Sequence, residues 1–154
     1  GSARADPQAQ VRRFFLDANV IFTAAHSPNG NGRALFRLAA ERQLELISSR
    51  YALEEAARNI AVKFPGCVAE FNSLIAGLLL VAEPSQAEIQ LAAARRLPDK
   101  DVPILAAAIA ARASVLVTGD RRDFGHRYGT TIEGVGVLTP AEAVSKALSS
   151  RVAK

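Results

Sequence analysis

Residues 100–120 read KDVPILAAAIAARASVLVTGD, and the hydrophobic pattern of this stretch decides the fold class. Ile104, Leu105 and Ala108 follow Asp101 at the spacing of one helix face. Residues 115–118 (VLVT) then form a β-branched run that predicts a strand. A helix followed at once by a buried strand is the repeating unit of a parallel sheet.

The same alternation continues along the rest of the chain. Further strands are expected at the start of residues 14–21 (FFLDANVI) and at residues 44–48 (LELIS), 78–82 (LLLVA, as a buried strand) and 136–138. Helices are expected at residues 32–41, 51–64, 68–77, 84–95 and 101–113, and from the Thr139-Pro140 capping pair onward. We therefore predict an α/β fold, a three-layer α/β/α sandwich with a central, mainly parallel sheet.

Length and composition predict one domain that does not enter a membrane. We expect the domain at residues 12–148, a disordered tag or N-terminal segment at 1–11 and a tail at 149–154. Hydrophobic residues make up 49% of the chain, yet no apolar run approaches the roughly 20 residues of a membrane span. A single cysteine, Cys67, excludes an intrachain disulfide and a cysteine-based zinc site, and no secretion signal is present. A net charge of +4 mildly favours a polyanionic partner.

Two aspartates fall where strands are expected to end. Asp17 follows residues 14–16, and Asp120 follows residues 115–118 after one glycine. Parallel sheets bind ligands beyond the carboxyl ends of their strands, so both positions suit a site. An aspartate after a strand can equally form a turn or cap the next helix.

Asp101 and the Glu54–Glu55 pair lie at helix starts. Asp101 should point toward the core side of its helix, which is costly unless the carboxylate is paired or binds a cation; an N-cap role is the alternative. On the second helix the expected apolar stripe is Leu53, Ala56, Ile60 and Phe64. This stripe lies nearer to Glu54 than to Glu55.

Three or four carboxylates gathered at one sheet edge repel one another unless cations neutralise them. Mg²⁺ or Mn²⁺ prefers oxygen ligands, and either ion can activate water for phosphodiester cleavage. The acids therefore favour a metal-dependent nuclease.

The motifs LDANVIF (16–22), SRYALEE (49–55), residues 100–120 and DF (123–124) together resemble the PIN-domain family. The resemblance spans about residues 13–147 and is nearest to toxin components of toxin–antitoxin pairs, the VapC-like proteins. It implies a Mg²⁺- or Mn²⁺-dependent ribonuclease acting on single-stranded RNA, often dimeric and cytoplasmic, with a small antitoxin as a possible partner. A non-toxin ribonuclease of RNA processing, or a catalytically weak RNA-binding module, is the alternative.

The resemblance also implies roles for single positions. Asp17, Asp101 and Asp120 would be metal ligands and, with the glutamate, catalytic acids. The family's spacing favours Glu55, against the helix wheel, with Glu54 as the fallback. Supporting or substrate-binding roles are implied for polar and charged neighbours: Asn19, Thr118 and Asp123 as support, and Arg121 and Arg122 for substrate phosphates.

Other functions fit the residues less well. A phosphatase with Asp17 as nucleophile would need a second aspartate where Asn19 stands. A receiver-like phosphoacceptor would need an acidic pair just before Asp17. His26 and His126 lie in loop-like segments without metal-ligand spacing, so solvent exposure is expected for both. Residues 27–32 (SPNGNG) lack the lysine of a P-loop and are expected to form a flexible loop near the site entrance.

Overall fold

A computed structural model of the chain describes residues 12–41, 44–119, 124 and 127–152. Within these residues a six-stranded sheet has the order β3-β2-β1-β4-β6-β5. Its strands are β1 (Arg12–Leu16), β2 (Leu44–Ser48), β3 (Leu79–Leu80), β4 (Val115–Val117), β5 (Thr131–Ile132) and β6 (Val135–Leu138). All pairings are parallel except β5 with β6, so the sheet is mainly parallel as predicted.

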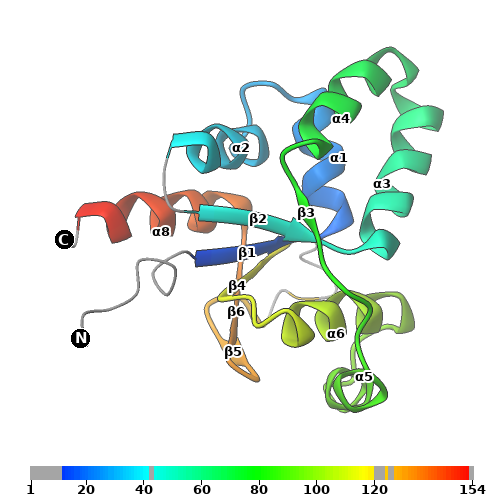
Figure 1. Ribbon diagram of the computed structural model, residues 1–154, viewed down its shortest axis with the longest axis vertical. Coiled ribbons are helices and arrows are strands. Elements are labelled where there is room, and N and C mark those ends of the chain that lie inside the picture. Colours follow the sequence, from blue (N-terminus) through cyan, green and yellow to red (C-terminus); the bar gives the residue numbers. More distant parts are fainter. Residues whose placement is uncertain (1–11, 42–43, 120–123, 125–126, 153–154) are drawn as a thin grey trace.

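Helices cover both faces of this sheet (Figure 1). The first face carries α1 (Ala18–His26), α2 (Asn31–Glu41), α3 (Arg50–Lys63) and α4 (Val68–Ile75). α8 (Pro140–Val152) packs against α2, and it continues past residue 148, where we expected the tail to begin. The opposite face carries α5 (Gln86–Ala93) and α6 (Val102–Ala110), which pack on each other. The α/β/α sandwich is therefore confirmed.

The core lies along the two central strands. Phe14, Phe15 and Leu16 of β1 are all fully buried, as are Leu116 and Val117 of β4. Such unbroken hydrophobic runs are typical of strands covered on both faces. Among the described residues no helix is both long and apolar enough to cross a membrane.

The chain reverses its direction of travel across the sheet between β1 and β4. From β1 it moves outward to β2 and β3, then crosses back to β4 on the other side of β1. In such sheets the crevice at the carboxyl ends of the two strands flanking the reversal is the usual ligand site. Asp17 directly follows β1, and Thr118 directly follows β4.

Two predicted strands lead to different outcomes. The strand expected at the start of residues 14–21 ends at Leu16, directly before Asp17 as predicted, but helix α1, which we did not predict, starts at Ala18. The buried strand expected at residues 78–82 is only Leu79–Leu80, whose side chains are 52% and 54% exposed. β3 is the outermost strand beside β2, and few residues cover it there.

Smaller differences concern helix ends and loops. The helix expected at 101–113 is a short 3₁₀ turn, Asp99–Asp101, followed by α6, which ends at Ala110. His26 is half-buried and stacks on Phe64 with ring centroids 4.1 Å apart, so the expected solvent exposure was wrong. The loop expected at 27–32 is shorter, because α2 already begins at Asn31. His126 lies outside the described residues.

Candidate active site

Asp17 is fixed by β1 on one side and α1 on the other. Its backbone N–H donates to Val117 O at 3.0 Å, which extends the β1–β4 ladder by one residue. Its carboxylate Oδ1 accepts a 2.7 Å hydrogen bond from the N–H of Ala18 and thereby caps α1. The capping role that we had left open is thus present. Only 5% of the residue is exposed.

The second carboxylate oxygen of Asp17 faces the end of β4. The fully buried Thr118 donates its hydroxyl to Asp17 Oδ2 at 2.8 Å. The amide nitrogen of Asn19 lies 3.5 Å from both Asp17 Oδ2 and Thr118 Oγ1. The amide oxygen of Asn19 accepts from the N–H of Gly119 at 2.9 Å. Asn19 therefore ties the start of α1 to the loop that follows β4.

Two further residues hold this arrangement, and sequence reasoning had missed both. The hydroxyl of Ser48, at the end of β2, donates to Leu16 O at 2.8 Å, one residue before Asp17. The hydroxyl of Tyr128 donates to Thr118 O at 2.8 Å. Tyr128 gives no sequence signal, because it is a lone tyrosine that reaches β4 only through the tertiary fold. For Ser48, the available sequence signal was its position as a small polar residue at the end of a predicted strand.

Asp101 is the second buried carboxylate, with 4% of the residue exposed. It stands at the N-cap position of α6, but its side chain makes no capping hydrogen bond, so the capping alternative is wrong. The helix α6 ends four residues before β4 begins and runs back across the sheet. Its first residue therefore lies at the same edge as the carboxyl end of β4.

The structure distinguishes Glu55 from Glu54. Glu54 is exposed, whereas Glu55 is half-buried. The buried residues of α3 are Ala52, Ala56 and Ile60. At about 100° per residue, this stripe is turned toward Glu55 by roughly 45° relative to the one we expected. The wheel argument for Glu54 was wrong because Leu53 is only half-buried and Phe64 lies beyond the helix.

The hydroxyl of Tyr51 is influenced by the charges of both Glu55 and Asp101. Partial burial raises the pKa of the Tyr51 hydroxyl, and the negative charges of Glu55 and Asp101 raise this pKa further. Both carboxylates therefore act on the same phenol at the start of α3. The side chain of Tyr51 is nevertheless partly open to solvent.

Four predicted site residues lie outside the described part of the chain: Asp120, Arg121, Arg122 and Asp123. Phe124, the second residue of the DF motif, is described and fully buried. Within the described ranges, no three His, Cys, Asp or Glu side chains are grouped closely enough to hold a metal ion. Asp17 and Asp101 are thus the two buried carboxylates among the described residues, and Glu55 and Asp101 both raise the pKa of Tyr51.

The donor chemistry of this site fits a hard divalent cation. Carboxylates supply its charge, and hydroxyl and amide groups surround them, as Mg²⁺ and Mn²⁺ prefer. Burying two carboxylates costs several kcal/mol unless a positive charge or hydrogen bonds compensate. Asp17, Asp101 and the undescribed Asp120 are the residues that would hold such an ion.

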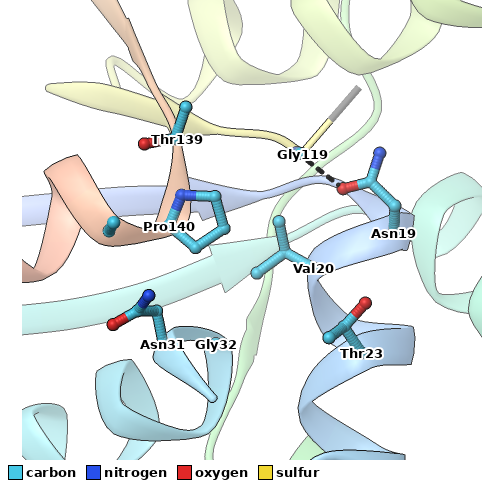
Figure 2. A pocket seen from close by; sticks show the side chains of 9 residues that line it. Asn19, Val20, Thr23, Asn31, Gly32, Gly119, Thr139 and Pro140 are labelled. Atoms are coloured by element: carbon cyan, nitrogen blue, oxygen red, sulfur yellow. Dashed lines mark hydrogen bonds between the residues drawn. The ribbon is translucent and has the colours of Figure 1, made fainter. Parts of the chain in front are cut away.

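A cavity of about 380 Å³ lies beside Asn19, the neighbour of Asp17. It lies between α1, the first residues of α2 and α8, and Gly119 after β4 (Figure 2). Asn19 belongs both to this cavity and to the hydrogen-bonded group around Asp17. Gly32 suits the close packing of α2 on α1, because a Cβ there would lie 3.2 Å from Val20 O, a tight contact.

A mainly parallel sheet with a buried acid at its reversal point defines an α/β protein with an acidic residue at the usual ligand-binding edge. The chain belongs to the PIN domain family, which its sequence matches over residues 13–122. PIN domains are generally nucleases that use divalent metals. The resemblance seen in the motifs is thereby confirmed. Comparison with curated proteins gives no match.

Solved structures share the fold at low sequence identity. VapBC2 from Rickettsia felis, bound to a DNA fragment from its promoter, superposes with a TM-score of 0.62 at 17% identity, covering 82% of this chain and 98% of that chain. PAE2754 from Pyrobaculum aerophilum gives a TM-score of 0.66 at 16% identity, covering 92% and 98%. VapBC-1 from nontypeable Haemophilus influenzae gives 0.59 at 13% identity, covering 84% and 98%.

Proposed function

We propose that this chain is a Mg²⁺- or Mn²⁺-dependent endoribonuclease that hydrolyses single-stranded RNA. The observation that carries the proposal is the presence of two buried carboxylates in a PIN domain: Asp17, directly after β1 at the β1–β4 switch point, and Asp101, at the start of α6. Neither carboxylate is explained by helix capping alone: Asp101 makes no capping bond, and Asp17 Oδ2 faces Thr118 instead. We expect cleavage to leave 5′-phosphate and 3′-hydroxyl ends.

In this proposal each residue has a defined task. Asp17 and Asp101 hold the cation, and Thr118 and Asn19 keep the Asp17 carboxylate oriented toward it. When bound, the cation neutralises charge developing on the phosphodiester and makes an attacking water more nucleophilic. Water oxygen forms the new bond to phosphorus, the bond from phosphorus to O3′ breaks, and the departing O3′ takes up a proton. In this proposal the half-buried Glu55 accepts the proton that water gives up.

The residues after β4 complete the proposal. Asp120 follows Gly119 directly and would be the third metal ligand, with Asp123 as an accessory acid. Arg121 and Arg122 would contact phosphates of the RNA strand. The net charge of +4 supports a polyanionic substrate.

A cleavage assay tests the catalytic proposal. Wild type and Asp101→Asn are compared on labelled single-stranded RNA in Mn²⁺, with EDTA controls. Asp99→Asn is the matched control, since Asp99 is an exposed aspartate only two residues away. We expect cleavage by wild type and Asp99→Asn and its loss in Asp101→Asn. Calorimetric titration should show Mn²⁺ binding to the wild type and to Asp99→Asn, and loss of this binding in Asp101→Asn. Equal cleavage by all three proteins, or no cleavage by any of them at high protein concentration, contradicts the proposal. RNA binding without cleavage supports the alternative of a non-catalytic RNA-binding module.

We further propose that the chain is the toxin of a toxin–antitoxin pair, that it forms a dimer and that it acts in the cytoplasm. VapBC2 and VapBC-1, both of which share its fold, support this role. Induced expression of the wild type should stop growth, and Asp101→Asn should not. Coexpression of a small protein encoded next to this chain should restore growth. Normal growth with active wild-type enzyme would instead favour a ribonuclease of RNA processing.

A further inference from the structure

We propose that the cavity beside Asp17 binds one base of the RNA strand, next to the phosphate that is cleaved. The inference rests on the proposed ribonuclease function and extends it to substrate recognition. The cavity volume of about 380 Å³ lies in the range of small-ligand pockets, about 300–1,000 Å³. Its wall begins at Asn19, whose amide nitrogen is 3.5 Å from Asp17 Oδ2. A base in the cavity and a phosphate at the acids can therefore belong to adjacent positions of one strand.

The lining of the cavity suits a flat, uncharged group with a polar edge. Figure 2 shows Val20 and Pro140 in the middle, with the amides and hydroxyls of Asn19, Thr23 and Asn31 around them. Val20 is almost completely buried, so the half-buried ring of Pro140 and the exposed methyl group of Ala141 supply the apolar surface that a ligand could contact. A nucleobase has apolar faces and hydrogen-bonding edges, which are the two properties that this lining provides.

Two side chains at the rim are available to contact a ligand. Neither the Thr23 hydroxyl nor the Asn31 amide is hydrogen-bonded to any other described residue, and both side chains are exposed. An amide can donate and accept at once, so it can pair with the edge of a base in two hydrogen bonds. Asn31 is therefore the residue that should discriminate between bases.

The charges around the cavity favour a base over a second phosphate. None of the described lining residues is charged. The start of α8 is closed by a capping box, in which Thr139 N–H donates to the Glu142 carboxylate at 2.9 Å and Glu142 N–H donates to the Thr139 hydroxyl at 3.1 Å. This carboxylate places negative charge at the helix end that would otherwise attract an anion.

The first arm of the test measures binding without any cleavage. Adenosine, guanosine, cytidine and uridine are titrated separately into isotope-labelled protein in EDTA, with inorganic phosphate as the comparison. We expect one nucleoside to shift the NMR signals of the Asn31 side-chain amide and of Gly32 and Gly119 most strongly. Ala141→Trp fills the cavity mouth and should abolish these shifts, whereas Ala69→Trp, at an exposed position of α4, should preserve them.

The second arm measures base preference during cleavage. RNAs that differ only in the base next to the cleaved bond are compared by kcat/KM. Asn31→Ala and Thr23→Val should each reduce the wild-type preference by about tenfold, the effect of one hydrogen bond. Asn72→Ala, an exposed asparagine on α4, should keep the preference. Asn31→Ala leaves the fold intact because its side chain is exposed, so it also covers the case in which Ala141→Trp does not fold.

The outcomes separate this inference from the proposed function. Nucleoside shifts that depend on Ala141 together with a base preference that depends on Asn31 support it. It is overturned by shifts with phosphate alone, by nucleoside shifts that persist in Ala141→Trp, or by a preference unchanged in Asn31→Ala and Thr23→Val. If the wild type does not cleave RNA, the ribonuclease proposal fails. The nucleoside titration then decides the base site by itself.

Discussion

The hydrogen bond from Thr118 to Asp17 offers the sharpest test of how the acid site is built. Thr118→Val removes one hydroxyl and keeps the β-branched shape, in a side chain that is fully buried. The lost bond is 2.8 Å long and ends on a carboxylate with 5% of its residue exposed. A hydrogen bond to a charged group contributes about 1.5–3 kcal/mol to the free energy of unfolding. For a chain of this size the melting temperature should fall by about 3–12 °C.

The measurement is thermal and urea unfolding in EDTA, which removes any stabilisation by bound cations. Thr131→Val is the matched control, because Thr131 is an exposed threonine on β5. Its effect should stay within about 0.5 kcal/mol. Equal stability of Thr118→Val and wild type, or an equal loss in Thr131→Val, would refute the reasoning.

A double-mutant cycle identifies the partner of the Thr118 hydroxyl. Asp17→Asn keeps a residue that caps α1 well, while removing the negative charge. If the hydroxyl acts on the carboxylate, Thr118→Val should cost less in the Asp17→Asn background, with a coupling of about 1 kcal/mol. Strict additivity would mean that Thr118 stabilises the fold by another route.

Three further predictions concern the scaffold around the site. Arg33→Lys should lower the free energy of unfolding by about 1–3 kcal/mol. The guanidinium donates to Ala24 O at 2.7 Å, to Ala25 O at 3.2 Å and to Glu70 at 2.7 Å, and one ammonium cannot replace these three hydrogen bonds. Urea unfolding measures this loss, with Arg37→Lys as the control, and equal effects of the two substitutions would contradict the prediction. Ser48→Ala should lower the free energy of unfolding by about 1–3 kcal/mol, because Leu16 O loses its side-chain donor. Hydrogen exchange of the β1 amides should become faster in this variant. Unchanged exchange and unchanged stability would show that Ser48 does not hold β1 in place. Hydrogen bonds from Ser85 lower the pKa of Glu88 below its usual 4.5, so their contribution to stability is complete above that pH and is lost as the pH falls through the lowered pKa. Between pH 6 and pH 2 the melting temperature should therefore decline less in Glu88→Gln than in the wild type, and parallel curves would disprove this contribution.

Sequence patterns predicted correctly those helices and strands whose local residue pattern matches their burial in the fold. β2 spans Leu44–Ser48 as expected, since Leu44, Leu46 and Ile47 form a short apolar run around Glu45 that suits a covered strand. The start of α8 also follows from local chemistry, because Thr139, Pro140 and Glu142 form a capping motif that depends on no distant residue.

Other features depend on tertiary contacts that no local pattern contains. The run around Asp17 is hydrophobic on both sides, so its period does not show that a strand gives way to a helix at Ala18. The prediction that residues 78–82 are buried was wrong, because hydrophobicity does not reveal whether a strand is in the centre or at the edge of a sheet.

The candidate site divides in the same way. Strand ends and helix starts were enough to select Asp17 and Asp101. The family's motif spacing favoured Glu55, but the helix wheel favoured Glu54, because the sequence does not show that Ala52 and not Leu53 is the first fully buried residue of α3. Tyr128 could not have been found, because its contact with Thr118 exists only after β4 and the following loop are folded together.

The two oxygens of Asp17 place different demands on the same position. One oxygen caps α1, a task that asparagine or serine performs nearly as well. The other accepts from Thr118 and, in the proposed function, would bind the cation, for which its negative charge is needed. A lineage released from selection for cleavage could therefore exchange Asp17 for asparagine and still fold. Inactive descendants of this domain should be stable proteins, and their loss of chemistry should be visible at Asp17 before it is visible anywhere in the fold.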